Sequence, residues 1–177
     1  MRIFTAVIFI LIAKICMAGE YEKYMNETFA LIDIGKNEEA LQRFIWLHNN
    51  GVSEGLTSNP SRLSFGLVYW VDFGKKYPPA IDALEKIRDI HTRNVLGGVE
   101  SCDLFQEVEA INSHLSEDTK TINLFTQLDK NQPHYAQLCW AYFKELAINS
   151  KLQYFIDKYI ANIKIEYDEA EQRFISI

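Results

Sequence analysis

The sequence lacks the motifs that mark most cofactor sites. It has no glycine-rich phosphate-binding loop and no Gly-x-Ser-x-Gly nucleophile motif. Its three cysteines and four histidines are scattered, without the spacing of a metal site. The histidines are His48, His91, His114 and His134. We therefore predict no metal, no cofactor and no catalytic residue.

Proline and glycine are also scarce. With four prolines and eight glycines among 177 residues, the chain has little room for flexible linkers. Hydrophobic residues make up 48%, an ordinary share for a globular protein. This length is sufficient for one domain with a core of its own. We predict a single helical-repeat domain over residues 19–177.

The first eighteen residues have a different character. Arg2 precedes an apolar run from Ile3 to Ala13, and the segment ends in Cys16-Met17-Ala18 before a polar stretch. These are the three zones of a secretory signal peptide, and the run is shorter than the roughly 20 apolar residues of a transmembrane helix. We predict a signal peptide over residues 1–18 and export to the periplasm or outside the cell. The alternatives are a membrane anchor over residues 3–13 and a cytosolic apolar helix.

Basic residues are too few to balance the acidic ones. The chain has 18 lysines and arginines against 24 aspartates and glutamates, a net charge of −6. Cleavage after Ala18 would remove Arg2 and Lys14 and leave 16 basic residues, a net charge of −8. A surface of this sign repels phosphate backbones, so we predict no nucleic-acid partner.

Apolar residues recur with helical spacing, most clearly between Ser61 and His91. Pro60 suits a first helical turn, with Asn59 as its N-cap. Gly74 suits a left-handed C-cap, and Pro78-Pro79 prevents that helix from continuing. The pattern predicts two helices joined by a tight corner. Their inner positions are Leu63, Leu67, Trp70, Val71, Ala80, Ile81, Leu84, Ile87 and Ile90.

Three further helix pairs are predicted from the same pattern. One covers residues 21–50, with a corner at Gly35. Another covers residues 104–128, and the last begins at Pro133 and extends to Ile160. The tail from Lys164 to Ile177 keeps helical spacing, and we expect a terminal helix with a polar outer face.

Two parts of the chain match each other and a known repeat family. The corner segments Asp33–Lys36 and Asp72–Lys75 align, with their aspartates 39 positions apart, which lies within the period of helical repeats. Gly35, Ala40 and Phe44 have the spacing of the second helix of a tetratricopeptide repeat.

A second element of the resemblance lies in the central pair. The segment Trp70-x-x-Phe73-Gly74-x-x-Tyr77 is similar to the first-helix pattern W-x-x-L-G-x-x-Y of that family. The resemblance implies an all-α, tetratricopeptide-like α-solenoid. We expect a right-handed superhelical array of about four αα-hairpins with a C-terminal capping helix.

Cys102 and Cys139 would remain after cleavage at Ala18. In an exported protein they could form a disulfide. They could equally be two buried thiols, because apolar residues flank both of them. The spacing does not decide between these alternatives.

An aromatic cluster in the central pair has two interpretations. Its members are Tyr69, Trp70, Phe73 and Tyr77, with the bases Arg62, Lys75 and Lys76 nearby. Core packing between hairpins is the first interpretation. The second is the wall of a groove, because tryptophan and tyrosine dominate interface hot spots. The residues assigned to partner binding are Arg62, Tyr69, Trp70, Phe73, Lys76 and Tyr77. The local bases have two interpretations, a site for an acidic peptide and the simpler one of solubility and charge complementarity at the end of a helix.

These observations favour a non-catalytic, exported protein–protein interaction module that binds a peptide or protein on a concave helical surface. One alternative is an immunity or inhibitor protein that neutralises a toxin or enzyme by direct binding. Another is an enzyme with a site assembled from scattered residues such as Glu107, His114 and His134. A third is a subunit of an envelope assembly. Membrane contact is expected only through an uncleaved N-terminal segment.

Overall fold

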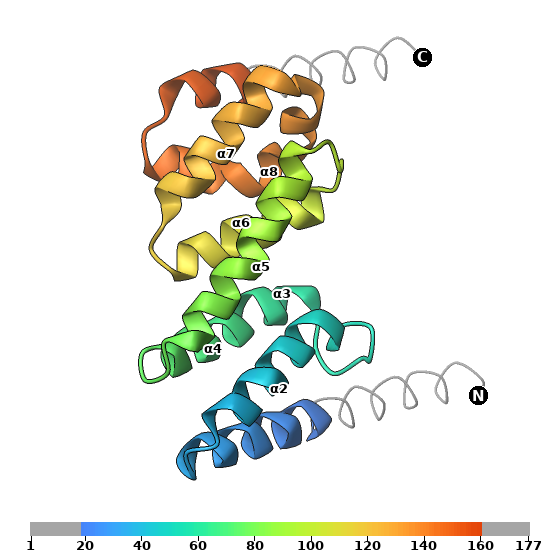
Figure 1. Ribbon diagram of the computed structural model, residues 1–177. Helices are drawn as coiled ribbons and strands as arrows, with labels where there is room; N and C mark the ends of the chain where they lie inside the picture. Colours follow the sequence, from blue (N-terminus) through green and yellow to red (C-terminus); the bar gives the residue numbers. More distant parts are fainter. Residues whose placement is uncertain (1–18, 161–177) are drawn as a thin grey trace, which may run out of the picture. The chain divides into compact units, whose positions relative to one another are not determined.

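The computed structural model describes residues 19–160, and every regular element in this range is a helix (Figure 1). The described residues contain no strand, which confirms the predicted all-α class. Among them, no helix is long and apolar enough to cross a membrane. The predicted signal peptide (1–18), the alternative anchor (3–13) and the predicted terminal helix (164–177) lie outside the described residues.

The described helices follow one another as four pairs, each joined by a short corner. The corners lie at residues 34–36, 75–78, 115–117 and 150–152, close to the predicted positions. The helical segments are residues 19–33, α2 (Asn37–Asn50), α3 (Asn59–Ser61), the π-helical turn η1 (Arg62–Gly66), α4 (Leu67–Gly74), α5 (Pro79–Leu96), α6 (Cys102–His114), α7 (Asp118–Asn131), α8 (Pro133–Asn149) and residues 153–160.

The chain forms two compact units, with the boundary inside α5 between Lys86 and Ile87. Among the described residues, unit 1 contains 19–86 and unit 2 contains 87–160. The prediction of a single domain over residues 19–177 stays a prediction.

Trp70 lies at the centre of the core of unit 1. It is 1% exposed, and its ring contacts those of Phe44 and His48 at centroid distances of 5.7 and 5.6 Å. Its Nε1 donates a hydrogen bond of 2.8 Å to the carbonyl oxygen of Ala80. Because the indole is buried and its one donor is satisfied, Trp70 fixes α4 against the first turn of α5.

Gly74 ends α4 for a different reason from the one predicted. Its φ is not positive, and Lys75, which follows it, has a right-handed helical conformation. A Cβ atom at position 74 would lie 2.3 Å from Cδ1 of Ile81, so the close approach of α5 requires glycine. The prediction of a left-handed C-cap is therefore wrong for Gly74. That conformation occurs at Gly35, where φ is +76°.

The helical stretch before α4 also begins differently from the prediction. Ser58, not Asn59, is the N-cap, and its Oγ accepts a hydrogen bond of 3.3 Å from the backbone N–H of Ser61. Asn59 is the first residue of α3, and its Oδ1 accepts a hydrogen bond of 2.8 Å from Arg62. The helical stretch then passes through η1, and π-helical turns are often found at functional sites.

The core of unit 2 is dominated by aromatic rings. Phe125 on α7 stacks on Phe143 of α8, with centroids 4.0 Å apart. The edges of Phe105, Phe155 and Tyr159 meet the same ring at 5.8, 5.3 and 5.5 Å. Contacts among α6, α7, α8 and residues 153–160 therefore converge on one side chain.

A disulfide joins Cys102 at the start of α6 to Cys139 in the middle of α8. The two Cα atoms lie 5.1 Å apart, within the range that the bond requires. Of the two alternatives left open by the sequence, the structure has the disulfide. Cys139 is completely buried, so the bond lies within the hydrophobic core of unit 2.

Buried charges in unit 2 are paired. Arg88, 4% exposed, forms ion pairs with Glu117 and with Asp89. The buried Asp129 accepts hydrogen bonds from Lys158, Tyr154 and Tyr159 on the last described helix. Burial alone would raise the pKa of Asp129, but these hydrogen bonds outweigh burial and lower it.

Candidate functional site

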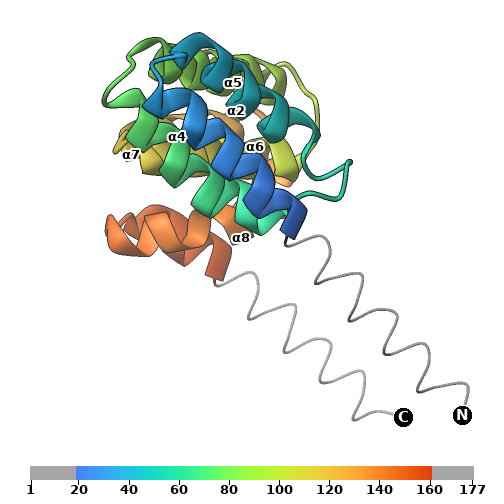
Figure 2. The ribbon, with the colours of Figure 1, turned by 90° about the horizontal axis from the view of Figure 1, so that it is seen from below.

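A hollow of about 190 Å³ lies in unit 1, between the helix of residues 19–33 and α4. Figure 2 shows these two helices side by side, the first in blue and α4 in green. The lining residues are Phe29, Ile32, Asp33, Tyr69, Asp72, Phe73 and Lys76. The hollow therefore combines aromatic and acidic groups from two helices with a basic group, Lys76, from the corner after α4.

Helical spacing explains why these residues lie together. The first helix contributes Phe29, Ile32 and Asp33, which are three and four positions apart and share one face. The second helix contributes residues at the same intervals, beginning with Tyr69. The ring of Phe29 meets that of Tyr69 at 5.4 Å, with an angle of 76° between the ring planes. This edge-to-face contact joins the two helices beside the hollow.

Phe73 forms the floor of the hollow. It is 4% exposed and stacks on Phe44 at 5.6 Å and on Tyr77 at 5.5 Å. These contacts hold the ring in the core, so little of Phe73 is open to a partner. The floor is therefore rigid and apolar.

The charged groups lie at the rim. Asp72 pairs with Lys75 at 3.2 Å, but both side chains are about two-thirds exposed and the pair contributes little energy. Asp33 and Lys76 are exposed. Asp33 has no ion pair with any residue between 19 and 160. The rim, counted as the charged groups that line the hollow, thus has two acidic groups and one basic group, and Lys75 pairs with Asp72 from outside the lining.

An exposed apolar stripe continues from the hollow along η1 and α4. Phe65 is 64% exposed, Val68 50% and Tyr69 39%. These three positions share one helical face, because they are three and four residues apart. Tyr69 belongs to both features, so the stripe and the hollow form one surface. We call it the stripe–hollow surface.

The residues assigned to partner binding from the sequence have four different environments. Tyr69, Phe73 and Lys76 line the hollow. Trp70 is buried in the core, as the packing interpretation of the aromatic cluster expects. Tyr77 donates a hydrogen bond of 3.0 Å to Glu38, and this bond raises the pKa of its hydroxyl.

Arg62, the remaining assigned residue, points elsewhere. Its guanidinium binds Asn59 and lies 3.0 Å from Nε2 of His48. It lines a separate cavity of about 10 Å³ beside Trp70 and Tyr21. A space of that volume is close to the minimum for one water molecule, so it cannot hold an organic ligand.

The sequence patterns do not identify Phe29, Ile32, Asp33, Phe65 or Val68 as site residues. A signal for Asp33 was present, because it aligns with Asp72 in the comparison of the two corners. Equivalent positions in consecutive helix pairs are expected to lie on the same surface of a repeat array. Nothing in the sequence indicates that Phe65 and Val68 belong to the site, because a sequence does not distinguish exposed apolar residues from buried ones.

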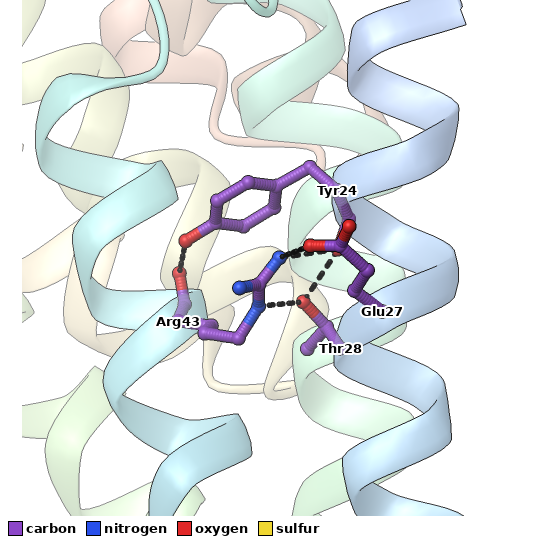
Figure 3. Close-up of polar contacts among 4 residues, drawn as sticks. All are labelled: Tyr24, Glu27, Thr28 and Arg43. Carbon is purple, nitrogen blue, oxygen red and sulfur yellow. Dashed lines mark hydrogen bonds and ion pairs between the residues drawn. The ribbon is translucent and has the colours of Figure 1, made fainter.

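A wider open hollow lies between residues 19–33 and α2, but its polar groups bind one another. Arg43 and Glu27 line this hollow, and Figure 3 shows their contacts: Arg43 binds Glu27 and Thr28 at 2.9 Å and lies over the ring of Tyr24. Glu38, which also lines the hollow, accepts a hydrogen bond of 2.8 Å from Gln42. These contacts join the first helix pair, and this hollow is a structural feature.

The residues of the alternative enzyme hypothesis have the following positions in the structure. Glu107 lies 3.3 Å from His91, which was not part of that hypothesis. Nδ1 of His114 lies 2.8 Å from the carbonyl oxygen of Ala110, one turn earlier in its own helix. His134 is exposed at the start of α8. Among the described residues, no group of three or more His, Cys, Asp or Glu is arranged to hold a metal ion.

Comparison with known proteins gave no match to a family model, to a curated protein or to a solved structure.

Proposed function

We propose that this chain is a non-catalytic protein–protein interaction module that binds its partner through the stripe–hollow surface of unit 1. The continuity of three exposed apolar side chains with a hollow carries this proposal. Contiguous exposed apolar patches larger than a few hundred Å² are uncommon on soluble proteins and often mark interaction sites. Aromatic anchors beside a pocket are typical of the energetic centre of an interface.

The proposed architecture supports the same surface. We propose that the four helix pairs form a tetratricopeptide-like right-handed array with a capping helix at its C-terminal end. In such an array the first helix of each pair lines the concave face. Residues 19–33 and α4 are the first helices of the first two pairs, and the hollow lies between them.

The proposed location is outside the cytoplasm. The disulfide between Cys102 and Cys139 supports this location, because such bonds persist in oxidising compartments. The signal-peptide pattern of residues 1–18 supports it independently. An immunity-type function would use the same binding surface and differ only in the consequence for the partner.

Two exposed valines allow a matched test of the proposal. Val68 is 50% exposed within the stripe, whereas Val52 is 44% exposed in the loop after α2. Immobilised chain from Gly19 onward, carrying either Val68→Asp or Val52→Asp, is exposed to an extract of the cells that produce it. Quantitative mass spectrometry then compares the proteins retained by each variant and by the unchanged chain.

We expect Val68→Asp to retain at least about tenfold less of a specifically bound protein than the unchanged chain, because a charge at the centre of an apolar interface must be desolvated. Val52→Asp should retain it like the unchanged chain. Equal retention by both variants would reject the stripe–hollow surface as the binding site.

A further inference from the structure

The polar groups of the hollow indicate which partner side chain it accepts. We propose that the hollow binds the guanidinium of an arginine from the partner protein. This inference rests on the proposed function and adds the chemistry of the ligand. It differs from the acidic peptide, one of the two interpretations of the local bases in the sequence, because two of the three charged groups at the rim are carboxylates.

The chain itself contains two sites built from the same groups. In the first, Cζ of Arg43 lies 4.0 Å from the centroid of the Tyr24 ring while its Nη2 binds the Glu27 carboxylate at 2.9 Å (Figure 3). A tyrosine ring and a carboxylate thus hold one cation by two attractions.

The second internal site is in unit 2. Nζ of Lys158 lies 5.6 and 5.5 Å from the ring centroids of Tyr154 and Tyr159, and it binds Asp129 at 2.6 Å. In both sites the cation comes from the same chain. Aromatic rings and a carboxylate are therefore a repeated solution for binding a cation in this fold.

The hollow also contains aromatic rings and carboxylates. Among the described residues, however, no cationic side chain pairs with Asp33. Phe29 and Tyr69 supply the rings, and Asp33 and Asp72 supply the carboxylates. Lys75 forms an ion pair with Asp72, but both side chains are exposed. A cation of the partner can therefore replace Lys75 at a small cost in free energy. Arginine suits this setting better than lysine, because a planar guanidinium stacks on a ring and pairs with a carboxylate at the same time.

The apolar stripe predicts the residue beside the arginine. A partner side chain that rests on Phe65 and Val68 would be apolar, since those positions are exposed and uncharged. The simplest probe is therefore acetyl-Gly-Leu-Arg-Gly-amide. Its matched control replaces arginine by citrulline, which keeps the shape and loses the charge.

Nuclear magnetic resonance of the isotope-labelled chain from Gly19 onward measures binding of each peptide. We expect the arginine peptide to shift the signals of Phe29, Asp33, Tyr69 and Asp72. The citrulline peptide should bind about fivefold more weakly, and only the arginine peptide should weaken as salt is raised.

Variants of the rim give the second arm of the test. Asp33→Asn should weaken the arginine peptide about threefold, while Lys76→Ala should strengthen it by removing a like charge. Glu54→Gln makes the same change in net charge as Asp33→Asn, but Glu54 is exposed in a loop and does not line the hollow. It should leave the affinity unchanged.

Three outcomes overturn the inference. Equal affinity for the arginine and citrulline peptides would do so while leaving the proposed interaction surface intact. Equal weakening by Asp33→Asn and Glu54→Gln would show an effect of net charge alone. No signal shift in the hollow up to about 10 mM arginine peptide would also reject it. The proposed function is tested separately. It fails if Val68→Asp retains the partner protein as well as Val52→Asp does.

Discussion

Unit 1 and unit 2 hold their helices together by different means. Unit 2 has a disulfide inside its core, a stack of aromatic rings around Phe125 and buried ion pairs. Unit 1 has no cysteine between residues 19 and 86, and its first helix pair is joined by the partly exposed network around Arg43. The covalent constraint and the buried charges are thus features of unit 2.

Their surfaces differ as well. The exposed large apolar residues of unit 2 are Ile90, Val99, Leu138, Ile148, Tyr154 and Ile160. No two of these described residues have the spacing of one helical face, whereas Phe65, Val68 and Tyr69 in unit 1 share a face. The comparison suggests a division of roles, in which unit 2 provides stability and unit 1 provides the binding surface.

The strongest test of this division is removal of the disulfide. The double change Cys102→Ala and Cys139→Ala opens a bridge between positions 37 residues apart. Loop-closure entropy predicts a loss of about 3–4 kcal/mol in the free energy of unfolding of unit 2. Hydrogen exchange resolved by segment should show this loss in α6, α7 and α8 and leave α2 unchanged.

Reductant gives the control for that experiment. Dithiothreitol should lower the stability of the unchanged chain to that of the double variant and have no effect on the variant itself. An equal loss of protection in α2 and α8 would show that the two units unfold together, and the proposed division of stability would then fail.

A smaller effect is expected at Gly74 in unit 1. Gly74→Ala should cost about 1–3 kcal/mol, because the new Cβ would overlap Cδ1 of Ile81 and force α4 and α5 apart. Hydrogen exchange resolved by segment measures this loss in α4. In an Ile81→Ala background the same change should cost little. A cost that is independent of residue 81 would indicate backbone strain instead of overpacking.

Gly74 also shows how far the sequence could predict the structure. Helical spacing and the proline pair located the corner, because both act through local backbone geometry. The reason for glycine could not be read from the sequence, since it depends on how closely α5 approaches α4. The same limit applies to Trp70 and Tyr69, which are neighbours in an apolar run although one is buried and the other lines the hollow.

The two aspartates of the hollow show a different limit of prediction from the sequence. Asp33 and Asp72 were visible as aligned positions, but a short polar side chain before a corner glycine has an ordinary local explanation in the turn. Only the contact between Phe29 and Tyr69 shows that the two aspartates lie at one hollow. Contacts between residues 40 positions apart depend on the packing of two helix pairs, which single-sequence patterns do not specify.

The smallest expected effect concerns Glu109 in unit 2, where stability and pH are linked. Burial, together with repulsion from Asp118 and Glu145, raises the pKa of Glu109 to about 7. A raised pKa means that the folded state disfavours the charged carboxylate, so this group destabilises unit 2 as pH rises from about 4.5 to about 7. Above that pH range the free energy of unfolding of unit 2 is reduced by the full amount, and below it this reduction is absent.

Glu109→Gln removes this penalty and keeps the shape of the side chain. Because Glu109 is partly exposed and solvent screens its interactions, we expect a gain of about 1 kcal/mol at pH 8 and no gain at pH 4. Thermal unfolding of both proteins across this range measures the difference, and Glu100→Gln, at an acid in the loop before α6, is the matched control. A gain that is constant with pH, or one shared by Glu100→Gln, would place the repulsion elsewhere. A gain confined to Glu109→Gln at high pH would show that the charged form of this half-buried acid destabilises unit 2.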